Sequence, residues 1–313
     1  MARKTKKTVD FLIFCIFGTV SAVFFLLPRK ACLGLGRLLG SFLFRADRRH
    51  RELVLANLEA ALGGELLLEE RRRIARDSFR TFGKVMADTI KWTHLSHRRR
   101  LRLLSLEGAD HLRRALEEGR GAILFSAHFG NWEVASLAVS RFARLNVVAR
   151  PLDSRVLERR LLRFRKSLGA RVISKFQAAK PVLQALRRNE AVAILMDQNV
   201  LRSQAVFVDF FGRPAATTPA VGSFCARARS PLLPIFCYPT AAFSYTIRIG
   251  PPVEVGLSGS LDEDVLKITR HCTKMIESEI RQNPGLWFWF HDRWKTRPPD
   301  APRSAGAGHH YAA

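Results

Sequence analysis

The residues best suited to chemistry follow a short apolar run near the middle of the chain. The run 122–126 contains only Ala, Ile, Leu, Phe and Ser, and His128 and Glu133 lie just beyond it. A carboxylate beside an imidazole can orient the ring and stabilise its charged form, while the other ring nitrogen accepts a proton. We therefore expect His128 to be a general base that Glu133 orients. A core histidine beside a capping glutamate is the structural alternative.

The sequence around this pair predicts a strand, a tight turn and a helix. The run 122–126 has the length and apolarity of a strand that is buried on both faces of a parallel sheet. Gly130 permits a tight turn, Asn131 is a good helix-capping residue, and a helical pattern begins at Glu133. In such a unit the functional site lies at the carboxyl end of the strand.

The segments that follow alternate between strand and helix patterns. Strands are expected over 146–150, 171–174, 191–196, 232–238 and 243–249, and helices over 153–168, 180–188 and 262–282. The segment 206–211 is expected to be a loop or an edge element. This rhythm predicts an α/β fold with a mostly parallel central sheet flanked by helices.

Further polar residues are expected at the same edge of the sheet. Arg150 and Asp197 end predicted strands, and Arg165 lies on the helix next to this face. A bidentate arginine could meet a phosphate or a developing anion. The turn amides near Gly130 and Asn131, or a nearby cation, could stabilise an oxyanion. The alternatives are a cap or internal ion pair for Arg150, a turn carboxylate for Asp197 and a solvated helix surface for Arg165.

Composition narrows the class of partner. The chain has 52 Lys and Arg against 27 Asp and Glu, a net charge of +25, which favours an anionic partner such as a membrane surface or an acidic protein. No nucleic-acid-binding signature is present, so nucleic acid is not the expected partner. The five cysteines have neither disulfide nor metal-ligand spacing, there is no His-Glu-x-x-His motif, and we expect no metal and no cofactor.

The N-terminus predicts membrane attachment. An apolar run over 11–27 is preceded by cations and closed by Pro28, and it lacks a signal-peptidase site. Cations beyond it favour a cytoplasmic body on a single inner-membrane anchor. Alternatively, 31–44 lies in the membrane interface. We expect an anchor and interfacial segment over 1–45, an α/β domain over 46–297 and a disordered tail over 298–313.

The chain resembles the lipid A late acyltransferases, the lauroyl and myristoyl transferases of lipopolysaccharide synthesis, within the glycerolipid acyltransferase superfamily. The resemblance covers nearly the whole chain and rests on an ordered set of motifs: the apolar N-terminus, 55–58, 128–133, 150–153, Asp197 with Gln198, 210–214 and 293–298. In the superfamily the catalytic pair is commonly His-x4-Asp. Here Glu133 takes the second position, as in the lipid A branch.

The resemblance implies transfer of an acyl chain from acyl carrier protein, or from acyl-CoA, to a hydroxyl of a lipid A precursor. His128 would take the hydroxyl proton as the oxygen attacks the thioester, and Glu133 would hold the ring. Asn131, Arg150, Asp197 and Arg165 are the expected substrate-binding residues. Two alternatives stay open: another acceptor, such as a phospholipid or a phosphatidylinositol mannoside, and an inactive basic protein that binds lipids.

Overall fold

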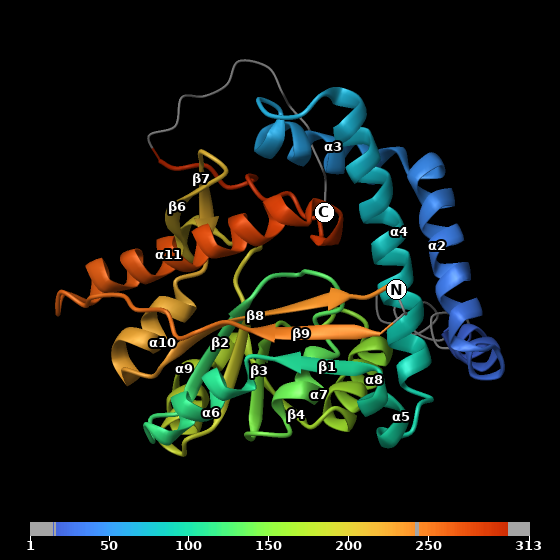
Figure 1. Cartoon of the computed structure of the whole chain (residues 1–313). Coiled ribbons are helices and arrows are strands. Elements are labelled where there is room, and N and C mark those ends of the chain that lie inside the picture. The colour runs from blue at the N-terminus through green and yellow to red at the C-terminus, as the bar shows by residue number, and fades with distance from the viewer. Residues whose placement is uncertain (1–14, 16, 242–243, 300–313) are drawn as a thin grey trace, which may run out of the picture.

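A seven-stranded sheet forms the centre of the protein (Figure 1). The computed structural model describes residues 15, 17–241 and 244–299. The strand order is β1-β9-β8-β2-β5-β3-β4, and β8, β2, β5, β3 and β4 run parallel. β9 is antiparallel to β8, and β1 is parallel to β9. The predicted α/β fold with a mostly parallel sheet is confirmed. The strands are β1 (Leu104–Glu107), β2 (Ala122–Ser126), β3 (Leu145–Ala149), β4 (Ala170–Ser174), β5 (Ala191–Leu195), β8 (Leu232–Pro239) and β9 (Tyr245–Ile249).

Helices cover both faces of the sheet, which explains why β2 is apolar throughout. Ile123 and Phe125 pack into one core cluster and Leu124 packs into the other, and all five residues of β2 are buried. The first core includes residues of α9, α10 and α11, and the second includes residues of α6, α7 and α8. Their bounds are α6 (Ala109–Glu117), α7 (Ala135–Val139), α8 (Arg155–Ser167), α9 (Ala179–Arg187), α10 (Ala220–Ala228) and α11 (Leu261–Gln282).

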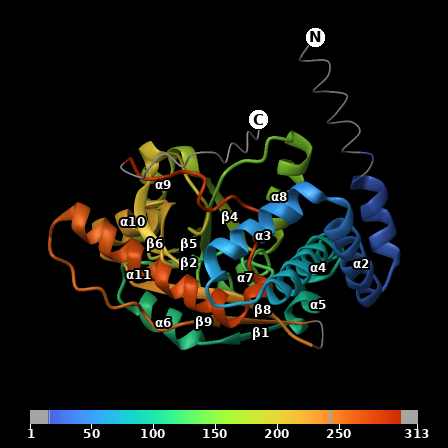
Figure 2. The same cartoon turned by 90° about the horizontal axis from the view of Figure 1, so that it is seen from above.

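Two helices precede the sheet in the chain, α3 (Arg48–Leu62) and α4 (Leu68–Trp92). A further helix, α2 (Arg29–Ala46), packs along α4, and the two lie side by side in Figures 1 and 2. The contact needs glycine, because a Cβ atom on Gly83 would lie 2.1 Å from the carbonyl oxygen of Gly36. The two helix backbones therefore meet directly.

The expected N-terminal anchor is not supported by the described part of the chain. Among those residues, no helix is long and apolar enough to cross a membrane. The first part of the predicted anchor segment, 11–27, lies outside the described residues. Most of the predicted tail, 298–313, also lies outside them.

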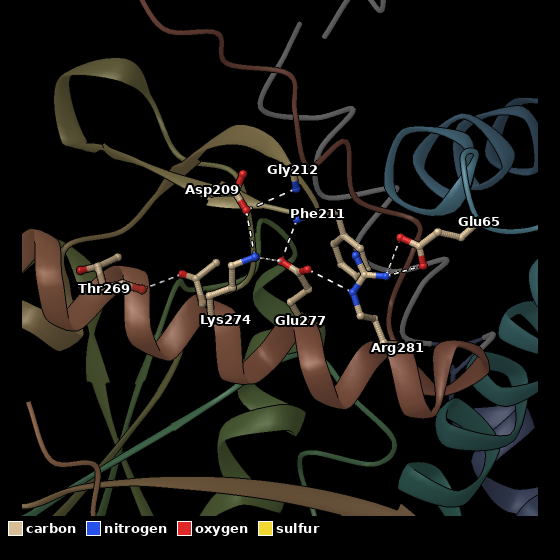
Figure 3. A network of polar contacts seen from close by, with 9 residues as sticks. Glu65, Asp209, Phe211, Gly212, Thr269, Lys274, Glu277 and Arg281 are labelled. Atoms are coloured by element: carbon tan, nitrogen blue, oxygen red, sulfur yellow. Dashed lines mark hydrogen bonds and ion pairs between the residues drawn. The ribbon is translucent and has the colours of Figure 1, made fainter.

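The segment expected to be a loop or an edge element is the first strand of a hairpin. β6 (Val206–Phe210) pairs antiparallel with β7 (Arg213–Thr217), and the hairpin packs against α11. Glu277 of α11 accepts a hydrogen bond from the backbone N–H of Phe211 at 2.8 Å and pairs with Lys274 and Arg281 (Figure 3). These contacts fix the hairpin to the helix.

Candidate active site

His128 and Asp197 meet at the carboxyl edge of the sheet. β2 and β5 are neighbouring parallel strands in which Ser126 lies opposite Leu195. His128 and Asp197 each lie two residues beyond this pair, just after the ends of the strands. Nδ1 of His128 donates a hydrogen bond to Oδ1 of Asp197 at 2.9 Å, since an ionised carboxylate can only accept hydrogen bonds. The backbone N–H of His128 donates to Oδ2 of the same carboxylate at 3.0 Å. The register of two neighbouring strands thus creates an oriented imidazole–carboxylate pair.

Asp197 is a buried anion. Burial alone would raise the pKa of Asp197, but the charge and hydrogen bonds of His128 and the indole N–H of Trp287 outweigh it and lower the pKa to about 2. The carboxylate therefore stays ionised at neutral pH. His128 is 21% exposed and lines a cavity, and its Nε2 makes no hydrogen bond to the described residues. This arrangement suits a general base whose second nitrogen accepts a proton from a bound group.

Glu133 has a different partner from the one expected. Instead of contacting His128, it forms a bidentate pair with Arg165 of α8, with bonds of 2.9 and 2.6 Å. The reason lies in the turn: Gly130 has a φ of +56°, and the chain turns away before α7 begins at Ala135. The five-residue spacing thus brings Glu133 close to His128 in sequence while its carboxylate meets the neighbouring helix.

The Glu133–Arg165 pair lines the same cavity and is largely withdrawn from water. The two side chains are 10% and 11% exposed. Burial lowers the pKa of Arg165, but the hydrogen bonds and charge of Glu133 outweigh it, so the pKa lies above its ordinary value. Arg165 is therefore a fixed cation in the cavity wall, which a solvated helix surface would not provide.

The cavity has a volume of about 1800 Å³ and extends from the sheet edge to the N-terminal helices. Its lining includes His128, Phe164 of α8, Phe224 of α10, Ile90 of α4 and Ser21. Apolar side chains dominate, as they do in sites that enclose the apolar part of a ligand. The space is large enough for a long flexible chain.

The remaining predicted site residues occupy different depths. Arg150 lines the cavity but is exposed, and it pairs with Asp153 at 3.3 Å. Asn131 is fully buried, is absent from the cavity lining, and donates from Nδ2 to the hydroxyl of Tyr245 at 3.1 Å. Tyr245 in turn donates to Asp88 of α4. Asn131 therefore connects the turn after His128 to the helical layer, whereas Arg150 is an exposed part of the cavity lining.

Sequence reasoning missed the part played by the C-terminal segment 286–297. Trp287 donates from Nε1 to Asp197 at 2.7 Å, and His291 lines the cavity and accepts the backbone N–H of Asn199 at 2.9 Å. Burial lowers the pKa of His291 to about 4, so this imidazole is neutral at physiological pH. The signal that the sequence offers for this segment is a run of aromatic residues and cations after the last helix.

Asn57 of α3 holds this segment in place. Its Nδ2 donates to the carbonyls of Trp289 and His291, at 2.8 Å each. Asn57 belongs to the motif 55–58 noted in the sequence. This motif thus binds the C-terminal segment, and Asn57 and Trp289 are 232 residues apart along the chain.

Comparisons with known proteins identify relatives of the chain. A family profile described as bacterial lipid A biosynthesis acyltransferase matches residues 2–296. The lipid A biosynthesis lauroyltransferase of Escherichia coli is 27% identical over 282 residues, which is 88% of this chain and 89% of that protein. The palmitoleoyltransferase of the same organism is 26% identical over 275 residues, 87% of each chain. A phosphatidylinositol mannoside acyltransferase of Mycobacterium tuberculosis is 28% identical over 223 residues, 69% of each chain. The chain therefore belongs to the bacterial lipid A biosynthesis acyltransferase family and is an acyltransferase.

Proposed function

We propose that the protein transfers a fatty acyl chain from a thioester to a hydroxyl of a glycolipid, with His128 as the general base. The observation that carries this proposal is the bond between His128 Nδ1 and Asp197, together with the position of His128 in the lining of a large, mostly apolar cavity. Nε2 would take the hydroxyl proton as the oxygen attacks the thioester carbon. The thiolate leaves as the ester bond forms, and the imidazolium returns the proton to it.

Asp197 takes the orienting role that the sequence suggested for Glu133. Its charge stabilises the imidazolium, and its hydrogen bond keeps the proton on Nδ1. Glu133 fixes Arg165 in the cavity wall, where the guanidinium can attract an anionic group of the substrate or the developing oxyanion. Arg150, at the exposed end of the cavity, is placed to meet a phosphate of the acceptor or donor. Asn131 supports the turn instead of touching the substrate.

The acceptor we favour is a lipid A precursor, because the family and two relatives named above are lipid A enzymes. A phosphatidylinositol mannoside is the second candidate, favoured by the mycobacterial relative. For the donor, a net charge of +25 supports an acidic acyl carrier protein, with acyl-CoA as the alternative thioester.

Purified protein assayed with each donor against a lipid A precursor, a phosphatidylinositol mannoside and a phospholipid separates these possibilities. We expect transfer to the lipid A precursor to be fastest. Faster transfer to the mannoside would change the acceptor but keep the chemistry. No transfer to any of the three would overturn the proposed function.

The outer face of α2 supports attachment to a membrane surface. Leu35, Leu38, Leu39 and Phe42 recur at helical spacing and are 44%, 67%, 55% and 61% exposed. Exposed cations, including Arg37, lie on the same helix. An apolar helical face with cations is typical of helices that lie in the interface of an anionic bilayer.

Flotation with phosphatidylglycerol vesicles tests this attachment. We expect the wild-type protein to float and a Leu38→Glu/Phe42→Glu variant to float less. Equal flotation of both would show that another surface binds the lipid.

A further inference from the structure

Trp287 contacts the carboxylate that holds His128. Its indole N–H donates to Oδ2 of Asp197 at 2.7 Å, and the side chain is 2% exposed. The same oxygen accepts the backbone N–H of His128, and Oδ1 accepts Nδ1. Among the described residues the carboxylate therefore has three donors, and the indole is the one that comes from outside the two strand ends.

The backbone fixes the indole relative to His128. Trp287 forms an antiparallel bridge with Phe129. On either side of it, Gly130 N–H donates to the carbonyl of Leu286 and Phe288 N–H donates to that of His128, each at 2.9 Å. The segment that carries Trp287 is thus paired with the turn that carries the base.

We propose that Trp287 is a positioning residue for the acyl-transfer reaction, holding Asp197 in the orientation in which it binds Nδ1 of His128. This inference rests on the proposed function, in which His128 is the base. The indole hydrogen bond to Oδ2 adds to the two bonds from His128 in restraining rotation of the carboxylate. The indole N–H also offsets part of the negative charge of the Asp197 carboxylate. The carboxylate therefore attracts a charged imidazole less strongly.

Removing the indole N–H should therefore have two effects. Asp197 becomes more mobile, so the base is held less well and the rate falls. The carboxylate also presents more of its charge to His128, so the pKa of His128 rises and the acidic limb of the pH profile moves to higher pH. A residue that only packs would change neither the pH profile nor the pKa of His128.

Other charged and titratable groups surround the pair and stay in place in such a variant. The C-terminal segment contributes His291, Arg293 and Lys295, which interact electrostatically with each other or with Asp197. The turn and α8 contribute the Glu133–Arg165 pair, which lines the same cavity. All of these groups are present in each variant that is compared. A difference in the pH profile between the variants therefore reports on the indole hydrogen bond.

Trp289 provides a matched control. It is fully buried, its ring centroid lies 4.5 Å from that of Trp287, and its Nε1 donates at 2.7 Å to the carbonyl of Pro284. Trp289→Phe therefore removes an indole hydrogen bond of the same length from the same aromatic cluster, but one that does not reach the catalytic pair.

The experiment compares Trp287→Phe and Trp289→Phe in the full chain. The pH profile of kcat/KM is measured with an acyl donor, and the titration of His128 is followed by NMR with nitrogen-15-labelled histidine. For Trp287→Phe we expect a loss in kcat/KM of roughly tenfold or more at neutral pH, as for a hydrogen bond to a charged group. We also expect a higher pKa of His128. For Trp289→Phe we expect neither change.

Equal pH profiles and equal titration of His128 in the two variants would overturn the inference. If Trp287→Phe does not fold, benzothienylalanine at position 287 keeps the ring shape without the N–H and serves the same comparison. The NMR titration needs no activity, so it separates two kinds of failure. A shifted pKa together with a fully active His128→Ala variant would refute the proposed base but leave Trp287 as the residue that positions Asp197. An unshifted pKa together with an inactive His128→Ala would refute only the role of Trp287.

Discussion

Two buried carboxylates, Asp197 at the sheet edge and Glu277 on α11, are similarly inaccessible but differ in their partners. Glu277 is 5% exposed and is held by a backbone N–H, Lys274 and Arg281, and the two cations also pair with Asp209 and Glu65 (Figure 3). Asp197 is 4% exposed, and its ion-pair partner is His128. Every partner of Glu277 keeps its protonation state near neutral pH, whereas an imidazole can change it.

The difference indicates which feature suits a buried anion to the proposed catalysis. Both oxygens of each carboxylate accept hydrogen bonds. Neither burial nor hydrogen bonding therefore distinguishes Asp197 from Glu277. Of the two, only Asp197 holds a titratable group that lines a cavity. Glu133 is intermediate, because it lines the cavity but holds an arginine, which cannot exchange a proton.

Among the buried carboxylates, the largest expected effect is that of Asp197→Asn on the rate. The amide cannot stabilise an imidazolium, and its NH₂ group can turn toward Nδ1 and favour the wrong tautomer of His128. We expect acyl transfer to fall by roughly 10²- to 10⁴-fold. The measurement is kcat at saturating donor, with circular dichroism to confirm folding. A rate within threefold of wild type, roughly the effect of a minor contact, would remove Asp197 from the mechanism.

Glu133→Gln should lower the stability, and it should lower the rate through Arg165, which loses the partner that fixes it in the cavity wall. It leaves the guanidinium of Arg165 buried without its carboxylate, and loss of one partner of a buried pair costs about 3–5 kcal/mol. The double variant Glu133→Gln/Arg165→Met should regain most of the lost free energy of unfolding, measured by urea denaturation. We expect the acidic limb of the pH–rate profile of Glu133→Gln to stay in place, because Glu133 does not contact His128. A displaced limb would mean that Glu133 acts on the base after all.

The stability of the protein should decrease in acid through His291. An unfolded histidine takes up a proton near pH 6.5, whereas burial lowers the pKa of His291 to about 4 in the folded protein. Protons therefore favour the unfolded chain as the pH falls through 6.5, and this effect levels off below about 4. Integrated over that window, the loss is on the order of 3 kcal/mol. Urea unfolding across this pH range should show a smaller decrease in His291→Gln than in wild type, and equal decreases would contradict the assignment.

The smallest effect is expected for Glu277→Gln. Lys274 and Arg281 keep Asp209 and Glu65 as partners, so the cost is about 1–2 kcal/mol, near that of one or two hydrogen bonds. The rate per folded molecule should not change, which is measured by titrating active sites before the assay. A tenfold lower kcat in the folded fraction would mean that the hairpin and α11 take part in the site, and the contrast with Asp197 would no longer hold.

The sequence was informative wherever local pattern decides structure. The apolar runs that end at His128 and Asp197 predicted both strands and placed polar residues at their carboxyl ends. It could not show that the two strands are neighbours, because β2 and β5 are separated along the chain by β3 and β4. The sequence suggested that His128 pairs with Glu133, which is close to it along the chain. In the structure His128 is hydrogen-bonded to Asp197 instead. β1 was missed because it is a short edge strand with alternating partial exposure.

The C-terminal segment marks the limit of sequence reasoning at the site. Its aromatic residues show no period of helix or strand, and their roles depend on contacts with residues far away in sequence. Trp287 reaches Asp197 across 90 positions, and His291 reaches Asn199 across 92. The composition of the segment could not identify a hydrogen bond to the His128–Asp197 pair.

The most direct test of the central claim is the rate of acyl transfer by His128→Ala, measured in single turnover with an acyl thioester and a glycolipid acceptor. His128 is partly exposed, so the variant should fold normally and keep its cavity. If His128 removes the hydroxyl proton, the rate of ester formation falls by roughly 10²- to 10⁴-fold while thioester binding is retained. A rate close to that of wild type would contradict the assignment of His128 as the base, whatever the acceptor.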